Sequence, residues 1–129
     1  MDRLEQQMKF ILEADKLKQI VRQSYIGGAD RKETDAEHSW HLALMCALLS
    51  EYAAEKIDVA KTMVMVLIHD MVEIDAGDTY AYDTEGNKSK RQREVKAAER
   101  IFHILPEDQA EYLRNLWEEF EAMETPEAR

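Results

Sequence analysis

A short segment near the middle of the chain gathers the residues that could do chemistry. His69 and Asp70 lie side by side at the end of the apolar run MVMVLI, and Glu73, Asp75 and Asp78 follow closely. A carboxylate buried among apolar side chains is unfavourable unless something compensates its charge. Imidazole nitrogen and carboxylate oxygen together suit divalent first-row metals. The segment therefore predicts a metal site, in preference to a buried His–Asp pair held only by hydrogen bonds.

Helix geometry sets what this segment needs from the rest of the chain. Adjacent side chains on a helix point about 100° apart, so His69 and Asp70 can bind one ion only if another element supplies a further ligand. Glu73 lies at i+4 from His69, on the same face of a helix, where it could be a general acid or base beside the metal. His38, at the start of the preceding apolar helix, is the candidate for the missing ligand. A lone histidine there is usually structural or exposed, and only the pattern with His69 and Asp70 favours a ligand.

The elements that must position these residues are predicted to be helices. Helix formers dominate and β-branched clusters are rare, so the sequence predicts an all-α bundle of about five helices. Their expected ranges are 3–21, 35–56, 58 to just before Gly77, 90–105 and 106–123, with loops at YIGGADRKETD and DTYAYDTEGNK. Thr34 and Glu37 fit a capping box before the second helix, and Asp58 can cap the third. The second helix contains HLALMCALL, apolar almost all round, which predicts a central position in the bundle.

Composition narrows the class of protein. A chain of 129 residues fits one domain on the usual scale of about 100–200 residues. Its 17 basic and 27 acidic residues give a formal charge of −10, which argues against a nucleic-acid polymer or an anionic membrane as the main partner. The single cysteine, Cys46, cannot form an internal disulfide, and no signal peptide or membrane-spanning run is recognisable. We therefore expect a cytoplasmic protein, with a small phosphorylated substrate still compatible.

Five blocks of the sequence resemble the HD-domain metal-dependent phosphohydrolases, and in particular their 5′-deoxynucleotidase branch. The blocks are LKQIVRQ, RKETDAEHSW, IHDMVEIDAGD, REVKAAERI and LWEEFEAMETPEAR, in the family's order over nearly the whole chain. The resemblance implies a single HD domain that hydrolyses a deoxynucleoside 5′-monophosphate to the nucleoside and phosphate. A non-catalytic nucleotide- or metal-binding module remains an alternative. So does an HD phosphohydrolase acting on a phosphodiester or a nucleoside triphosphate.

The resemblance also implies roles for residues at the matching positions. His38, His69 and Asp70 match the family's metal ligands, Glu73 matches the residue that handles proton transfer, and Asp78 matches a second active-site acid. These ligand types suit one divalent transition metal, and Mn²⁺, Fe²⁺, Co²⁺ and Zn²⁺ are all compatible with them.

Two arginines match positions that face the substrate. Arg22 matches an arginine facing the phosphate, and an arginine fork recognises phosphate bidentately. Arg31 matches a recurring arginine, for which a salt bridge that orders the loop is an equal expectation.

The sequence departs from the family pattern in two places. The family has a fourth metal ligand, an aspartate in the helix after TPEAR, whereas this sequence ends at Arg129. We therefore expect a further C-terminal helix in the natural chain, and weak metal binding without it. Gln23 stands where some members have an aromatic residue beside the sugar, which leaves discrimination between deoxy- and ribonucleotides open. A homodimer is expected, mainly from the resemblance and also from the apolar residues of the first and fifth helices.

Overall fold

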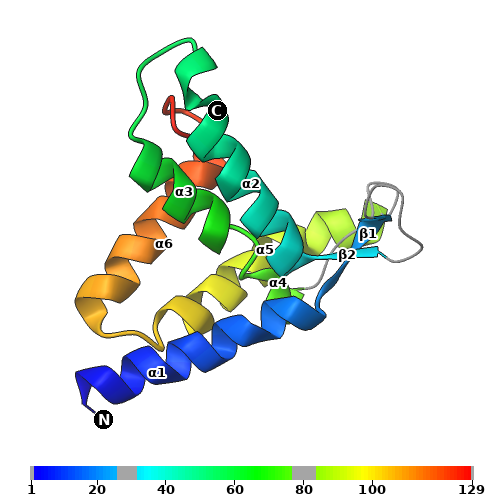
Figure 1. Cartoon of the computed structure of the whole chain (residues 1–129). Helices are drawn as coiled ribbons and strands as arrows, with labels where there is room; N and C mark the ends of the chain where they lie inside the picture. Colours follow the sequence, from blue (N-terminus) through cyan, green and yellow to red (C-terminus); the bar gives the residue numbers. More distant parts are fainter. Residues whose placement is uncertain (1, 26–31, 77–83, 129) are drawn as a thin grey trace.

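The computed structural model describes residues 2–25, 32–76 and 84–128, without the side chains of 22–25, 32 and 84–89. Within this part of the chain the protein is all-α apart from one short strand pair, which confirms the predicted class (Figure 1). The elements are α1 (Arg3–Ala14), the 3-10 helix η1 (Asp15–Gln19), β1 (Val21–Tyr25), β2 (Lys32–Thr34), α2 (Asp35–Leu49), the 3-10 helix η2 (Ser50–Tyr52), α3 (Val59–Ile68), α4 (Glu73–Ala76), α5 (Thr84–Phe102) and α6 (Glu107–Ala122).

Polar side chains start several helices where the sequence predicted them. The Thr34 hydroxyl accepts from the Glu37 N–H, and the Glu37 side chain accepts from the Thr34 N–H, which confirms the capping box of α2. Asp58 accepts from the Lys61 N–H at the start of α3. The predicted range of the last helix is correct to within one residue at each end.

The predicted first helix, 3–21, is too long. The α-helix ends at Ala14, one 3-10 stretch follows, and Val21–Tyr25 is a strand that pairs antiparallel with Lys32–Thr34. Val21 and Tyr25 have side chains that suit a strand. The partner strand follows a stretch that was predicted as loop, so local periodicity could not predict the pairing. The second strand leads directly into α2, whose first residue, Asp35, donates its N–H to the Ile20 carbonyl over 2.8 Å.

The predicted third helix is broken in the middle of the chemical segment. The helix ends at Ile68, residues 69–72 form turns, and α4 begins at Glu73. Tight i→i+3 bonds replace the helical pattern here, including Glu73 N–H to Asp70 carbonyl at 2.9 Å. The expected i+4 helical relation between His69 and Glu73 is therefore wrong, because the backbone turns between them.

Two other helix boundaries differ from the predicted ones. The second helix stops at Leu49 instead of residue 56, and η2 follows. The fourth begins at Thr84 instead of Lys90, so part of the predicted loop is helical. Gly86 and Asn87 have low helix propensity and no apolar period marks that stretch, so a helix could not be predicted there.

The hydrophobic core lies between α3, the turn after it, α5 and α6. Its buried side chains are Met65, Ile68, Met71, Val72, Ala97, Ala98, Ile101, Phe102, Leu116 and Trp117, together with Leu17 from η1. None of the helices in the described part of the chain is both long and apolar enough to span a bilayer.

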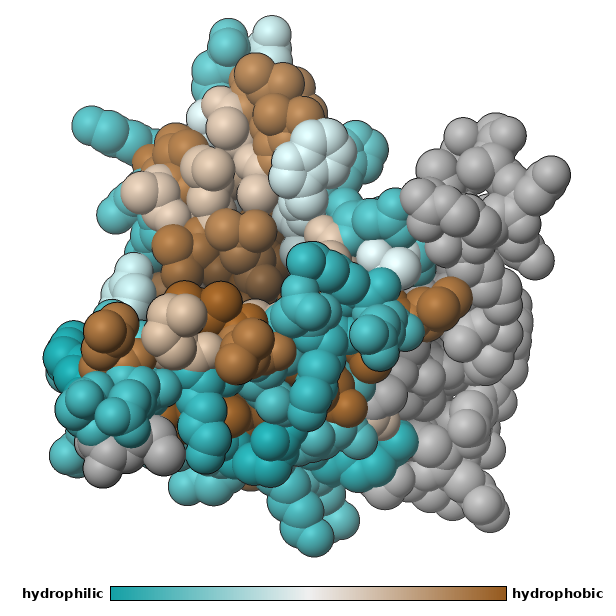
Figure 2. Space-filling view, turned by 60° about the horizontal axis from the view of Figure 1, so that its bottom comes forward, coloured by the Kyte–Doolittle hydropathy of each residue, from teal (hydrophilic) through white to brown (hydrophobic). Residues whose placement is uncertain are grey.

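The second helix is less central than predicted. Ser39 and Ala43 are buried on one face, but Trp40, Leu44 and Leu48 are 63%, 42% and 63% exposed. Figure 2 shows apolar side chains gathered over one face of the molecule. The apolar composition of α2 thus reflects exposed apolar surface as well as core packing.

Candidate metal centre

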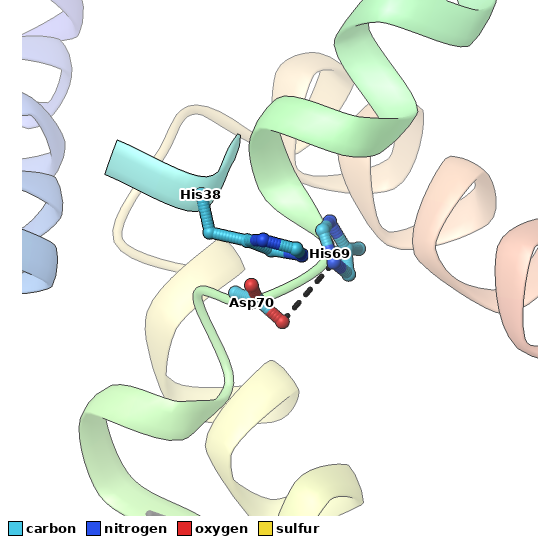
Figure 3. Close-up of side chains that lie close together, drawn as sticks. All are labelled: His38, His69 and Asp70. Carbon is cyan, nitrogen blue, oxygen red and sulfur yellow. Dashed lines mark ion pairs between the residues drawn. The ribbon is translucent and has the colours of Figure 1, made fainter. Parts of the chain in front are cut away.

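Three predicted ligands come together at one point. His38 extends from the first turn of α2, His69 is the C-cap residue that follows α3, and Asp70 lies next to it in the turn. One ligand atom from each lies within 4.8 Å of the other two, and the side chains point toward one another (Figure 3). The His69 Nε2 and Asp70 Oδ1 atoms are 3.1 Å apart, and the two imidazole centroids are 6.3 Å apart.

The His69 ring is held from two sides. Its Nδ1 lies 2.6 Å from the Val66 carbonyl oxygen, so Nδ1–H donates to that carbonyl. Phe120 from α6 packs against the ring with a centroid distance of 4.8 Å. A neutral imidazole carries one proton, so Nε2 then presents a lone pair to the Asp70 carboxylate. Two acceptors this close require a proton or a cation between them, and this geometry fits a metal bound by both.

The His38 ring has a different neighbour. Its Nδ1 lies 3.4 Å from Oε1 of Glu33, a residue of β2. The ring therefore has a carboxylate on one side and the His69–Asp70 pair at its end (Figure 3).

A second group of acids adjoins the same point. Asp35, Asp70 and Glu73 also bring ligand atoms within 4.8 Å of one another, and Asp35 is fully buried. Burial, followed by the nearby Asp70 and Asp35 carboxyls, raises the pKa of Glu73 to about 10. The cluster as a whole therefore favours taking up positive charge, as a proton or as a metal ion.

The donor set fits a divalent metal. Ligand atoms bonded to one ion at about 2.1 Å lie roughly 3–4 Å from one another, and the His69–Asp70 distance already falls in that range. His38, His69 and Asp70 could hold the ion, with the Asp35 and Glu73 carboxyls beside it. Imidazole and carboxylate ligands of this kind suit Mn²⁺, Fe²⁺, Co²⁺ and Zn²⁺.

The other predicted site residues fall outside the described side chains. Arg22 lies in β1, but its side chain is not described, and Arg31 and Asp78 lie outside the described residues. Asp75, which the sequence grouped with the site, instead forms an ion pair with Arg100.

Sequence reasoning missed two acids that the structure brings to the site. Asp35 lies three residues before His38, a spacing that puts both on one face of α2 and could have revealed it. Glu33 could not be found this way, because it lies on a strand that was expected to be loop.

Comparison with known proteins gives a consistent result. The HD domain family model matches residues 14–129. The crystal structure of a predicted metal-dependent phosphohydrolase from Magnetospirillum magnetotacticum MS-1 is 52% identical, with a TM-score of 0.91, over 98% of this chain and 63% of that one. A conserved hypothetical protein from Pyrococcus furiosus is 30% identical with a TM-score of 0.70, over 94% of this chain and 70% of that one.

A curated relative adds a named activity. Human 5′-deoxynucleotidase HDDC2 is 28% identical over 123 residues, which are 95% of this chain and 59% of that protein. This chain thus spans about three fifths of the length of that relative. With a family model that covers residues 14–129, the chain belongs to the HD domain family.

Proposed function

We propose that the protein is a metal-dependent phosphohydrolase that converts deoxynucleoside 5′-monophosphates to deoxynucleosides and phosphate. The observation that carries the proposal is the convergence of His38, His69 and Asp70, with Glu73 beside them. The human relative's name, 5′-deoxynucleotidase, supports the choice of substrate. The Magnetospirillum protein's description supports the broader class of reaction.

His38, His69 and Asp70 would hold the divalent metal. When bound, such an ion polarises a phosphoryl oxygen and lowers the pKa of water. The protein's own contribution is to fix the ligands: the Val66 carbonyl and the Phe120 ring hold His69. Arg22 and Arg31, which match substrate-facing arginines, are proposed to bind the phosphate.

Glu73 is proposed to move the proton. Its Oε1 is buried and has no hydrogen-bond partner among the described residues. In hydrolysis a water oxygen forms a bond to phosphorus, the bond from phosphorus to the 5′ oxygen breaks, and one water proton must reach the leaving oxygen. A buried carboxyl beside the metal ligands, with its pKa raised by burial in the metal-free site, is suited to take this proton from the water and give it to the leaving oxygen. Asp78 is proposed as the second acid of the site.

The test is metal-dependent phosphate release from a panel of substrates. We expect release from deoxynucleoside 5′-monophosphates in Mn²⁺ or Co²⁺, none after chelation, and a loss of about 10²–10⁴-fold in kcat in Glu73→Gln. Metal binding without release from any nucleotide would instead indicate a binding module. Release only from a phosphodiester or a nucleoside triphosphate would indicate the other HD chemistry.

Replacement of Arg22 tests the phosphate site separately. In Arg22→Ala, substrate binding and turnover should weaken together, because a phosphate contact is lost in the ground state and in the transition state. Unchanged kcat/KM would exclude Arg22 from the site.

A homodimer and a cytoplasmic location stay predictions. A groove of about 410 Å³ between α1 and α6 supports self-association, since Leu4, Met8 and Ile11 line it and are exposed. A monomer mass by light scattering at micromolar concentration would contradict the dimer.

A fourth metal ligand beyond TPEAR also stays a prediction. A chain extended by one further helix should bind Mn²⁺ more tightly than the 129-residue chain. Equal Mn²⁺ affinity and equal turnover of the two forms would contradict it.

A further inference from the structure

The two histidines of the candidate metal centre are oriented by different groups. A main-chain carbonyl, that of Val66, accepts from Nδ1 of His69 over 2.6 Å. The atom facing Nδ1 of His38 is a side-chain oxygen, Oε1 of Glu33, at 3.4 Å. Both Glu33 and His38 are largely shielded from water, with side chains 18% and 27% exposed.

We propose that Glu33 is a positioning residue that orients His38 for metal binding, an inference that rests on the proposed metal centre. The Glu33 carboxylate accepts the proton of His38 Nδ1, so Nε2 carries the lone pair that a metal requires. A ligating histidine usually gives its other N–H to such an acceptor, which fixes the tautomer and the ring plane and raises the basicity of the ligand.

Glu33 lies between the strand pair and the start of α2. Its strand is paired with β1 in a register that joins Val21 to Thr34 and Tyr25 to Lys32. The next residue, Thr34, caps α2, the helix that carries His38. Glu33 and His38 thus lie on either side of one helix start, and the strand register is irregular opposite Glu33.

The negative charge around His38 argues against a purely structural role for Glu33. Glu33 adds a carboxylate next to a histidine that already adjoins Asp70, and Asp70 is itself grouped with Asp35 and Glu73. A further negative charge there is unfavourable by itself. It becomes favourable when the imidazole N–H donates to the Glu33 carboxylate and a cation at the other ring nitrogen offsets the negative charge.

The experiment measures Co²⁺ binding by titration and by visible absorption, using the whole chain. In Glu33→Ala the Co²⁺ affinity should fall by about 10–100-fold, the usual cost of losing a group that orients a ligand. Glu33→Gln retains an acceptor oxygen and should recover part of the affinity. In the His38→Ala background, removal of Glu33 should have no further effect.

Two controls separate positioning from general damage. Thr34→Ala removes the cap of α2 and should lower the thermal midpoint, with a smaller loss of Co²⁺ affinity than Glu33→Ala. Glu111→Gln, an exposed change on α6, matches the loss of charge at a distant point. In the metal-free protein, ¹⁵N NMR should find His38 protonated on Nδ1 in the wild type and mixed in Glu33→Ala.

Unchanged Co²⁺ affinity and an unchanged His38 tautomer in Glu33→Ala would overturn the proposal. So would an equal loss of affinity in Thr34→Ala, or a wild type that binds no Co²⁺. A failure of the proposed function is distinguishable, because it would appear as absent phosphate release while the Co²⁺ and NMR differences between the variants remain.

Discussion

Two clusters of carboxyl groups in this protein have opposite electrostatic character. In one, Arg100 of α5 forms ion pairs with Glu13 of α1 and with Asp75, the latter at 2.6 Å from Nε. Burial alone would raise the pKa of Glu13, but hydrogen bonds from Arg100 and then Lys16 lower it overall. In the other, burial and the neighbouring Asp70 and Asp35 raise the pKa of Glu73 to about 10.

The opposite pKa shifts of Glu13 and Glu73 distinguish a cluster that stabilises the fold from a cluster suited to bind a metal ion. Arg100 supplies the positive charge that offsets Glu13 and Asp75, so this cluster joins α1, α4 and α5 without a bound ion. Around Glu73 the local electrostatics favour added positive charge, because burial and the neighbouring acids raise its pKa. Groups whose pKa is displaced in this direction mark candidate sites of function.

The largest expected effect comes from removing one carboxylate charge in each cluster. Asp70→Asn should lower Mn²⁺ affinity by more than about 100-fold, beyond the range typical of residues that only orient ligands. Asp75→Asn, the matched change, should leave Mn²⁺ affinity unchanged because Asp75 pairs with Arg100. Isothermal titration measures both, and equal losses in the two variants would contradict the comparison.

A smaller effect concerns pH and the metal-free protein. Because the pKa of Glu73 is raised from 4.5 to about 10 on folding, its protonated form stabilises the fold. That contribution is fully present below about pH 4.5 and is lost as pH rises toward 10. Glu73→Gln should remove this dependence and raise the free energy of unfolding at pH 8 by roughly 1–3 kcal/mol.

Urea unfolding in a chelator between pH 5 and 9 checks this prediction. Saturating Mn²⁺ should flatten the wild-type profile, since the metal supplies the charge that the proton supplies in its absence. Parallel profiles for wild type and Glu73→Gln in chelator would show that Glu73 does not hold the proton.

The smallest effect is expected at the Arg100 cluster. Arg100→Met should lower the free energy of unfolding by about 1–2 kcal/mol, because buried Glu13 loses a charged donor, while the 46% exposure of Arg100 moderates the loss. Since the pKa of Glu13 is lowered, its contribution is present above about pH 4.5 and disappears as pH falls through the folded value. Thermal unfolding between pH 3 and 7 should therefore show a flatter acid limb in the variant, with Mn²⁺ affinity retained.

Much of the fold could be predicted because it is encoded locally. Thr34, Glu37 and Asp58 mark helix starts through short-range hydrogen bonds, and the structure has these bonds. The pairing of β1 with β2 depends on residues on both sides of a connecting segment, and strand preference is set by such neighbours more than by the strand itself.

The candidate site was predictable only where short sequence motifs carry the information. The spacing of His38 from His69 and Asp70 matched a known pattern, and the structure brings these side chains together. The spacing of Asp35 from His38 puts both on one helix face, but the burial of Asp35 could not be predicted, because an acid in the first turn of a helix is commonly exposed and favoured there by the helix dipole. Its burial depends on how the elements around α2 assemble, which the local sequence does not encode.

The end of α3 connects helix termination to ligand chemistry. A helix continued through Asp70 would direct the Asp70 N–H at the Val66 carbonyl, four residues back. The chain turns after Ile68 instead, and the imidazole of His69 donates to that carbonyl. The end of the helix and the tautomer of His69, a proposed metal ligand, are therefore set by the same turn. Changes that favour helix through residues 69–72 would compete with metal binding without touching a ligand.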